Sequence, residues 1–577
     1  MRILLVICLV TIYSVGLVKG EGTNELMPTS ATQGRIHIAK SLGYFASFDC
    51  SPDYRLCIHI SSAGEIIYYG FGNAQMAWIG GPINMTDVDY RLRRPDGSTA
   101  IGQSDLPLSG QGFSSTYAQA IAGPEQLPGA SATGYQALSF IADMVGDWYI
   151  EFYYPDYNNS AREFAFFDIT VASGNTAIPG RIWSKAWQLS GSYIPPLPNE
   201  FYGTLYTYSN DSIVTSFYMN GIRIEAFCSF CNNRGTGSTS NPLIDRKSKT
   251  GFYKFPQYKI FLNNPDPVSY PTGSLGQFTE PPTVTTFCNG EADISIKVNK
   301  PGQVSLVLEF DPSPGIQSLD REYIFDVAPG VNILHWDGKN GIGQYSLNGT
   351  IVPVTVSYMN GITHFPVFDI NDQPGGFIVE LVRPAGSTPK VFWDDSGVGG
   401  TTELDGCVSA STGCHIWPNY FGDSKTINTW WYSGTTSSRI EFSVKRDYIG
   451  SIATEICQND SIYLNGVWVS LPGIYTINTS TSLGCDSTIT IILTLNPAPS
   501  VQLPPDQSLC NVTSFELDAG PGFATYLWNT GETTQKIVIS HHGTYWVTVT
   551  ALNGCSDTDE IVITTLSSIE PKLIKHN

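Results

Sequence analysis

The sequence predicts an all-β protein made of tandem immunoglobulin-like and jelly-roll-type β-sandwich domains. Segments of five to eight residues alternate apolar and polar side chains, as at 147–153, 294–298 and 304–310, and this period of two is typical of half-buried strands. The segments end at Gly, Pro, Asn or Asp, and the chain holds 56 Gly and 36 Pro among its 577 residues. No long run shows the 3.6-residue periodicity and the caps of a helix.

Composition argues against two classes of protein. Aromatic residues make up 12% of the chain, which is far too many for a disordered protein. The formal net charge is −20, and because an acidic chain repels phosphate backbones we expect no nucleic-acid partner.

At roughly 150 residues per domain, the length predicts about four domains.

The first 20 residues are typical of a cleaved secretory signal. Arg2 precedes an apolar core from Ile3 to Val18, and small residues stand at Val18 and Gly20. The core is shorter than the roughly 20 apolar residues of a membrane anchor. No later segment is apolar enough to span a bilayer, so we expect a secreted protein with no integral membrane segment after cleavage of the signal.

Eleven cysteines follow the signal, and an oxidising compartment favours disulfides between them. Proximity in the sequence predicts four bridges: Cys50 with Cys57, Cys407 with Cys414, Cys457 with Cys485, and Cys510 with Cys555. Of the remaining three, Cys288 is expected to bond Cys228 or Cys231. Cys228 and Cys231 also have the spacing of half a zinc site, but no second such pair supplies the four ligands that structural zinc requires.

A resemblance to a known module appears in the middle of the chain. The run His335-Trp336-Asp337-Gly338-Lys339-Asn340-Gly341, followed by Asn348-Gly349-Thr350 and a predicted strand at 352–358, is similar to the immunoglobulin-like domain of flagellar hook-capping proteins. The resemblance implies a sandwich domain at 291–358 of a kind that recurs in exported surface proteins.

The C-terminal part contains an internal repeat. Cys457 and Cys510 are each followed seven residues later by a leucine, and Gly473-Ile474-Tyr475 matches Gly543-Thr544-Tyr545. In both copies the tyrosine precedes the second cysteine by ten residues. We expect a late strand whose tyrosine closes a corner, with a disulfide back to the first strand. The linker at 496–499, which is rich in proline, separates the two copies.

These repeats also resemble a family. The phrases 517–520 with 526–531, and 473–475 with 484–487, are similar to the immunoglobulin-like and PKD-like repeats of gliding-motility-associated exported surface proteins, which are adhesin-like proteins of gliding bacteria. The resemblance implies a secreted protein associated with the bacterial cell surface. Together the observations predict a signal peptide at 1–20, an N-terminal β-sandwich domain at 21–175, a second β domain at 176–290, an immunoglobulin-like domain at 291–358, a β domain with a Trp-rich segment at 359–450, a short immunoglobulin-like repeat at 451–497, an immunoglobulin-like or PKD-like repeat at 498–566 and a tail at 567–577.

Motifs for catalysis are missing from the sequence. The eight histidines are scattered, and the chain has no zincin helix motif, no Gly-x-Ser-x-Gly elbow, no phosphate loop and no dinucleotide fingerprint. Catalytic triads can be assembled from distant segments, so the missing motifs favour a protein that is not an enzyme without excluding one.

Acidic turns offer weak candidates for calcium, and no other cofactor is expected. The candidate ligands are Asp337 with Asn340 and Asp394 with Asp395. The alternative, which the sequence favours, is a turn in which each Asp or Asn side chain bonds nearby backbone.

The segment Trp430-Trp431-Tyr432 is the candidate ligand-binding site, because aromatic rings can stack on the apolar faces of sugars. Alternation along a strand sends Trp430 and Trp431 to opposite faces, so at least one of them is expected in the core. The function predicted is a non-catalytic secreted or cell-surface adhesin or interaction scaffold that binds extracellular glycan or protein surfaces through loops and exposed aromatics. The alternative is a polysaccharide-directed exoenzyme, an extracellular glycan hydrolase with carbohydrate-binding accessory modules.

Overall fold

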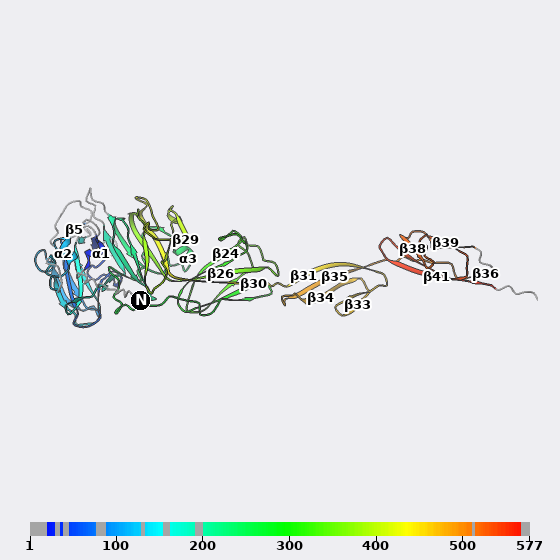
Figure 1. Cartoon of the computed structure of the whole chain (residues 1–577), viewed down its shortest axis with the longest axis horizontal. Helices are drawn as coiled ribbons and strands as arrows, with labels where there is room; N and C mark the ends of the chain where they lie inside the picture. Colours follow the sequence, from blue (N-terminus) through cyan, green and yellow to red (C-terminus); the bar gives the residue numbers. More distant parts are fainter. Residues whose placement is uncertain are drawn as a thin grey trace, which may run out of the picture.

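The computed structural model describes residues 20–28, 35–38, 45–76, 88–127, 133–153, 162–164, 166–190, 200–510 and 514–566. This part of the chain is elongated, with a broad head at one end and three smaller β modules in a row behind it (Figure 1). The predicted all-β class is confirmed, since strands form almost all of its regular structure. The predicted signal peptide up to residue 19 and the tail at 567–577 lie outside the described residues.

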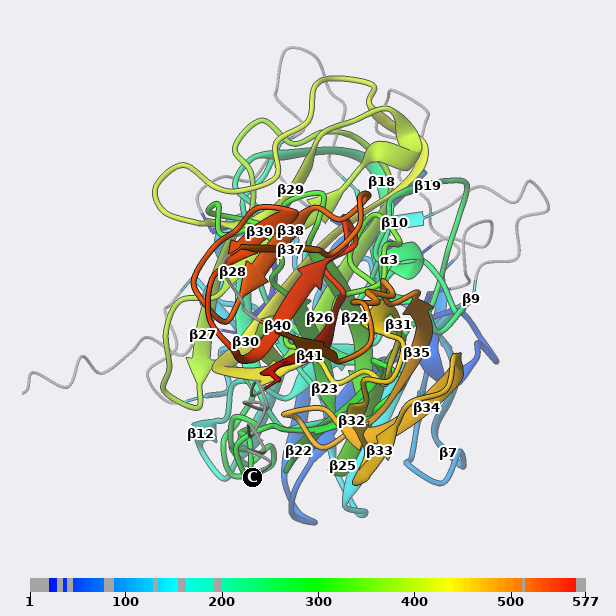
Figure 2. The same ribbon diagram turned by 90° about the vertical axis from the view of Figure 1, so that its right-hand side faces the viewer.

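Four parts of the molecule are named from this arrangement. The head comprises residues 20–276 and 360–434, and the first stalk module comprises residues 277–359 and 435–447. The second stalk module is 448–496 and the third is 497–566. Seen from the C-terminal end, the third module lies in front of the second module and the head (Figure 2).

The head contains three antiparallel sheets. The first has nine strands in the spatial order β27-β17-β16-β20-β13-β3-β9-β6-β7. These strands are β3 (Leu56–Ile60), β6 (Asp89–Arg93), β7 (Thr99–Asp105), β9 (Gly146–Tyr153), β13 (Ile182–Ser184), β16 (Thr204–Tyr208), β17 (Val214–Tyr218), β20 (Lys259–Phe261) and β27 (Ile378–Arg383).

The second sheet has thirteen strands, with the central order β29-β28-β30-β26-β18-β14-β2-β10-β5. Its strands are β2 (Arg35–Ile38), β5 (Ala74–Met76), β10 (Arg162–Phe164), β14 (Ala186–Ser190), β15 (Glu200–Phe201), β18 (Ile222–Phe230), β19 (Lys249–Thr250), β23 (Gly302–Leu308), β24 (Arg321–Val327), β26 (Ile351–Asp372), β28 (Lys390–Asp394), β29 (Thr402–Val408) and β30 (Gly422–Ser443).

A third, five-stranded sheet completes the head. It contains β1 (Glu21–Gly22), β4 (Ile66–Phe71), β8 (Leu138–Ile141), β11 (Phe167–Ser173) and β12 (Thr176–Ala177). The helices of the chain are short: α1 (Thr23–Leu26), α2 (Tyr117–Ala122), α3 (Pro242–Asp245), and the 3-10 turns η1 (Pro52–Tyr54) and η2 (Ser396–Val398).

One large apolar core lies between the sheets of the head. Trp148 of β9, Phe217 of β17, Phe365 of β26 and Trp431 of β30 all belong to it and are fully buried. The core therefore draws on strands from β3 to β30, and the described residues of 20–276 and 360–434 share one core, so the predicted domains 21–175, 176–290 and 359–450 do not each have a separate core.

Two strands of 22 residues, β26 and β30, run from the head into the first stalk module. They pair in antiparallel register from Ile351 opposite Ser443 to Phe368 opposite Thr426. Burial along β26 alternates up to residue 359 and is nearly continuous over 360–367, because the sheet gains cover on both faces where it enters the head. The predicted boundary between residues 358 and 359 falls inside β26, so the head and the first module share a continuous sheet.

The first stalk module closes this sheet with a second one. Its three-stranded sheet contains β21 (Thr283–Thr286), β22 (Ala292–Val298) and β25 (Gly330–Trp336), and Trp336 is fully buried between the two sheets. The indole of Trp336 donates to the carbonyl of Lys339 over 2.8 Å. The Trp336 side chain thus anchors the turn that follows it.

The other two modules repeat one plan, in which the first strand pairs in parallel with the last. The second module has β31 (Tyr448–Cys457), β32 (Ile462–Leu464), β33 (Val467–Val469), β34 (Gly473–Ser480) and β35 (Asp486–Asn496). The third has β36 (Gln507–Leu509), β37 (Phe515–Asp518), β38 (Thr525–Trp528), β39 (Lys536–Ile539), β40 (Gly543–Thr550) and β41 (Ser556–Thr565). Tyr475 and Tyr545 each donate a hydrogen bond to the carbonyl four residues earlier, which confirms the predicted corner.

The disulfides contradict most of the predicted pairing. Cys407–Cys414 is confirmed, but Cys485 bonds Cys288 and Cys457 bonds Cys555, so both of these bridges join neighbouring modules. The predicted bridges Cys457–Cys485 and Cys510–Cys555 are wrong. The two cysteines of each repeat lie at opposite ends of its module. The first strand runs parallel to the last strand, so the first cysteine, at the end of the first strand, lies where the chain leaves the module. The second cysteine lies at the other end, just before the last strand begins.

The other predicted pairs are also corrected. Cys50 packs beside Tyr54 and Phe230 in one cluster, whereas Cys57 packs beside Trp183 and Tyr270 in another, so their thiols are directed to different clusters and both are free. Cys231 is a free buried thiol, and Cys288 is used elsewhere, so the expected bond of Cys288 to Cys228 or Cys231 is wrong. The side chain of Cys228 lies outside the described residues.

Candidate functional site

The predicted binding segment Trp430-Trp431-Tyr432 lies inside the protein. Trp430 is 1% exposed, Trp431 is 0% exposed and Tyr432 is buried, so the prediction that they form a ligand-binding surface is wrong. Trp431 points into the core of the head, where its indole donates to the Thr215 hydroxyl over 3.1 Å. Trp430 and Tyr432 point to the opposite face and pack with Ile362.

That opposite face is covered by the segment around α3. Arg246 lies 5.5 Å from the Trp430 ring centre, and the His364 ring stacks on Trp430 at 5.6 Å. Asn428 Nδ2 lies 3.0 Å from His364 Nδ1. Burial, with a further contribution from the charge of Arg246, lowers the pKa of His364 to about 3, so the imidazole is neutral.

A small polar cavity of about 90 Å³ borders His364. Asp245, Gln303 and Asp326 also line it, and Asp245 is fully engaged, since its two oxygens accept bonds from the backbone and hydroxyl of Thr239. A volume of this size accommodates a few water molecules but not a sugar ring. The cavity is therefore part of the contact between the head and the first stalk module and does not resemble a ligand cleft.

A second buried polar network lies around His415. Its Nε2 is 2.9 Å from an oxygen of Asp395 and its Nδ1 is 2.7 Å from the Thr429 hydroxyl, while Trp393 stacks on the ring at 4.7 Å. The Ser248 hydroxyl donates to the other Asp395 oxygen over 2.5 Å. A His, a carboxylate and a hydroxyl are the components of a catalytic triad, but here the side chain of His415 is 0% exposed and that of Asp395 is 2% exposed, so the network is enclosed in the protein.

The calcium candidates are all engaged by protein donors. Asp337 Oδ1 accepts a bond from Arg321 over 2.7 Å, and Asn340 Oδ1 accepts bonds from two backbone amides of its own turn. Asp394 caps Ser396, and Asp395 belongs to the His415 network. Among the residues described by the structure, the one group of three or more metal-type ligands is Cys288, Asp447 and Cys485, and its sulfurs form the disulfide.

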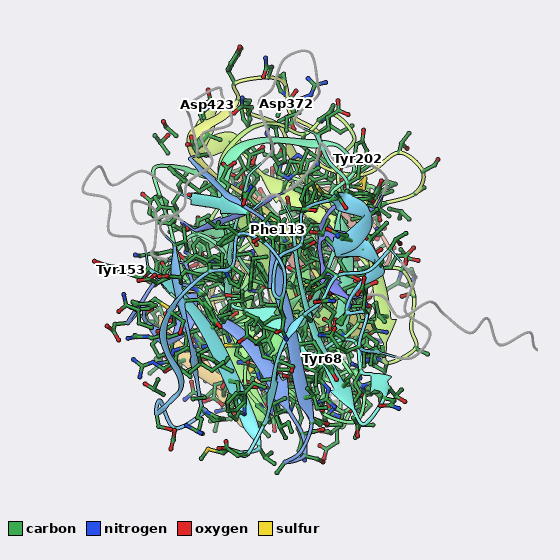
Figure 3. The ribbon with its side chains drawn as sticks, turned by 90° about the vertical axis from the view of Figure 1, so that its left-hand side faces the viewer. Tyr68, Phe113, Tyr153, Tyr202, Asp372 and Asp423 are labelled. Carbon is green, nitrogen blue, oxygen red and sulfur yellow. A yellow bond between two sulfur atoms is a disulfide. The ribbon has the colours of Figure 1, made fainter. Side chains whose placement is uncertain are left out.

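In the view of the free end of the head, the labelled side chains of Tyr68, Tyr153, Tyr202 and Asp423 lie apart from one another (Figure 3). No helix among the described residues has the length and apolarity to cross a membrane.

Exposed aromatic side chains gather instead on a hairpin of the second stalk module. Strands β32 and β33 place Tyr463 directly opposite Trp468, so both side chains leave the same face of the hairpin. Tyr463 is 57% exposed and Trp468 is 67% exposed. Their ring centres are 5.3 Å apart and their planes are inclined by 57°. The two rings therefore form a shallow, angled apolar surface that is open to solvent.

The hairpin geometry follows from its turn. Asn465 and Gly466 both have positive φ, at 45° and 84°, as a two-residue turn between twisted strands requires. The side chain of Leu464 in the same hairpin is buried, and Leu471 and Ile474, which follow the hairpin in the sequence, are exposed. The Asn-Gly pair between Tyr463 and Trp468 was the sequence signal that could have identified this site.

The third module shows that the fold does not need aromatics here. Leu517 takes the place of Leu464, and the pair opposite each other on the outer face is Glu516 and Val538. Glu516 forms an ion pair with Lys536 over 2.9 Å in that module. The corresponding strands thus carry a glutamate and a valine in one copy and an aromatic pair in the other, which indicates that Tyr463 and Trp468 serve something other than the core.

Comparisons with known proteins identify no family. No family model and no curated protein matches the chain. The similar solved structures include extracellular domains 3-5 of Drosophila OTK, with 9% identity over 51% of this chain and 97% of that chain at a TM-score of 0.14. The complex of Dpr2 Ig1-Ig2 with DIP-Theta Ig1-Ig3 matches with 10% identity over 51% of this chain and 100% of that chain at a TM-score of 0.14.

A third similar structure is SGBP-B of the Bacteroides ovatus mixed-linkage glucan utilization locus, in complex with a mixed-linkage heptasaccharide. It matches with 11% identity over 51% of this chain and 71% of that chain at a TM-score of 0.10. At such scores none of the three carries an argument about the function of this chain.

Proposed function

We propose that this protein is a secreted, non-catalytic binding scaffold whose stalk contacts an extracellular glycan through Tyr463 and Trp468. The observation that carries the proposal is the exposure of this aromatic pair on a hairpin, whereas the corresponding pair of strands in the third module, β37 and β39, has Glu516 opposite Val538. Large exposed aromatics cost solubility, so a protein that displays two of them side by side gains from their contact with a ligand.

A glycan fits the pair better than the other ligand classes. The angled rings are open to solvent and present apolar faces of the size of a sugar ring, which suits a long polymer chain that needs access from both sides. The net charge of −20 disfavours a polyanion such as a nucleic acid. Location outside the cell accords with the three disulfides and with the resemblance of the repeats to gliding-motility-associated surface proteins.

The test is a depletion assay with the chain from Glu21 to Asn577 and a panel of insoluble polysaccharides, with soluble sugar measured in the same tubes. The wild-type chain is expected to be depleted by at least one polysaccharide without release of sugar. Trp468→Ala is expected to weaken that binding about 30-fold, which is the effect of losing a hot-spot aromatic worth about 2 kcal/mol.

Two further variants make the assay specific. The double variant Tyr463→Glu with Trp468→Val copies the outer pair of the third module, so it preserves the fold while removing the rings, and it should lose binding as Trp468→Ala does. Trp546→Ala removes an exposed tryptophan from the third module and should bind like the wild type. Full binding by the double variant would contradict the proposed site, and release of sugar would contradict the non-catalytic function.

A further inference from the structure

The N-terminal strand of the head is buried from its first residue. Strand β1 pairs in antiparallel register with β11, with Glu21 opposite Ile169 and Gly22 opposite Asp168. Glu21 is 2% exposed, and Gly20 before it is also buried. The peptide bond between Gly20 and Glu21 therefore lies inside the folded head.

Asp168 is a buried carboxylate beside this strand, with 0% exposure. Tyr135 donates its hydroxyl to Oδ2 of Asp168 over 2.7 Å, and the Thr170 hydroxyl lies 3.1 Å from both carboxylate oxygens. Burial, with a further contribution from the charge of Glu25, raises the pKa of Asp168 to about 8. Among the residues that the structure describes, no lysine or arginine side chain pairs with Asp168. This carboxylate therefore lacks the positive partner that a buried charge normally has.

The neighbourhood of Asp168 has an excess of acidic groups. Glu25 of α1 interacts with both Glu21 and Asp168, so three carboxyl groups gather at this end of β1. Arg181, whose backbone amide donates to the Glu21 carboxyl group over 3.1 Å, has its guanidinium paired with two other carboxylates. A further positive charge would thus be favourable at this place.

The chain itself can supply that charge. A Cβ added at Gly20 would overlap the Asp168 carboxylate, so the carboxylate lies directly against the Gly20 backbone. Standard bond lengths separate the Glu21 nitrogen from the Gly20 Cα by roughly 2.4 Å, which places this nitrogen within about 5 Å of the carboxylate. In a chain that begins at Glu21, this nitrogen is an ammonium group instead of an amide.

We infer that removal of the signal peptide after Gly20 creates an α-ammonium group at Glu21 that binds the Asp168 carboxylate inside the head. Hydrolysis of the Gly20–Glu21 bond by a signal peptidase consumes one water molecule. The new carboxylate stays on Gly20, and the amino group stays on Glu21, where it is largely protonated at pH 7. Because this bond is buried in the folded head, the cut precedes the pairing of β1 with β11.

The ion pair makes the full stability of the head depend on maturation of the chain. An amide at Glu21 leaves Asp168 buried without a positive partner, whereas the ammonium group compensates its charge. The inference rests on the signal peptide predicted at 1–20 and is independent of glycan binding.

The test compares two starts of the chain. One chain runs from Glu21 to Asn577, and the other has two added alanines and Gly20 before Glu21. Each is made with and without Asp168→Asn, released from a fusion partner in mild denaturant and refolded. Hydrogen exchange of the β11 peptide is then followed at pH 7. Asp168→Asn is expected to speed this exchange at least tenfold more in the chain from Glu21 than in the longer chain, which has no ammonium group beside Asp168.

The comparison separates the ion pair from the other bonds of Asp168. The bonds from Tyr135 and Thr170 are present in both chains, so their loss affects both equally. An equal effect of Asp168→Asn in the two chains would therefore overturn the inference.

A second measurement needs no variant that might fail to fold. The α-amino group of the chain from Glu21 is titrated by the pH dependence of its acetylation, read by mass spectrometry of the N-terminal peptide. The charged groups that face it, the carboxyl groups of Glu21, Glu25 and Asp168, are all acidic. Pairing should raise its pKa above the ordinary range of about 7.7–8.0, whereas burial without a partner would lower it. A lowered pKa would contradict the ion pair, and so would a first residue other than Glu21 in the chain exported behind its own signal.

Discussion

At the residue scale, the polar groups that looked functional are packing elements. His364 and His415 are buried and stack on Trp430 and Trp393, respectively. Asn428 lies within hydrogen-bond distance of His364, and Asp395 lies within hydrogen-bond distance of His415. The lowered pKa of His364 couples the stability of the head to pH, because the unfolded chain can bind a proton at this histidine that the folded head cannot.

This coupling predicts acid sensitivity of the head. The pKa of His364 is lowered to about 3 from its ordinary value of 6.5. Above pH 6.5 this histidine is neutral in both the folded and the unfolded chain. As the pH falls from 6.5 toward 3, only the unfolded chain binds the proton, so the free energy of unfolding of the head decreases. Between these values the loss is about 1.4 kcal/mol per pH unit. We expect faster hydrogen exchange in β26 and β30 peptides at pH 5 than at pH 7, after correction for the intrinsic rates.

The variant His364→Gln should lose most of this acid sensitivity. His335→Gln is the control, since His335 is exposed and its pKa is raised by the bond to Asp293, so its contribution has the opposite sign. The interpretation fails if the His364→Gln head responds to acid as steeply as the wild type. Asn428 and Arg246, which interact with His364, and Asp245 and Asp326, which line the same cavity, are retained in all three proteins.

At the element scale, the same strand has two environments. In β30, residues 426–434 are all buried, whereas residues 435–441 alternate between exposed and half-buried. The alternation rule for a half-buried strand therefore holds in the stalk and fails in the head, which is why Trp430 and Trp431 are both core residues. The hairpin β32–β33 is the opposite case, a pair of short strands with one face in water.

The turn of that hairpin offers an element-scale prediction. Gly466→Ala keeps both aromatic rings but forces an alanine to adopt a φ of 84°, which costs about 1 kcal/mol. A Cβ at this position meets nothing nearer than the Tyr463 hydroxyl at 4.0 Å, so the effect is one of backbone strain and not of a clash. We expect glycan binding in the depletion assay to weaken roughly fivefold as the hairpin loosens.

The matched control is Gly473→Ala at the start of β34. Gly473 lies outside the positive-φ region, and a Cβ there makes an ordinary contact of 3.6 Å with the Tyr475 ring. This variant should bind like the wild type. Equal binding by the Gly466→Ala and Gly473→Ala chains would show that the hairpin geometry does not matter to the ligand.

At the scale of the whole molecule, the disulfides act at the joints. Cys288–Cys485 and Cys457–Cys555 span 197 and 98 residues of sequence and tie each stalk module to the next. In the chain-entropy account a disulfide that closes a loop of about 100 residues stabilises the folded state by about 4.7 kcal/mol. Each of these two disulfides therefore adds stability and also restrains the orientation of neighbouring modules. The third bridge, Cys407–Cys414, spans only seven residues and stays within the head.

The two disulfides between modules predict that the stalk is stiff and that it bends when one of them is removed. Cys555→Ser should free the third module to swing about the linker at Pro497, so small-angle X-ray scattering should lose the longest interatomic distances and show a smaller radius of gyration. Cys414→Ser breaks a bridge of the same kind inside the head and should leave the scattering profile unchanged. Identical profiles for the wild type and Cys555→Ser would mean that the linker contacts alone hold the joint.

The sequence by itself determined the strand class, the repeat and the corner tyrosines, because these depend on local alternation, turn residues and spacings that survive in any packing. It also located Cys407–Cys414, whose partners are neighbours in the chain. Only the tertiary structure decided which strands acquire a second covered face and which module ends meet. Trp430 is buried by a segment almost two hundred residues away, and Cys485 bonds across a joint, so neither outcome is encoded in the local pattern.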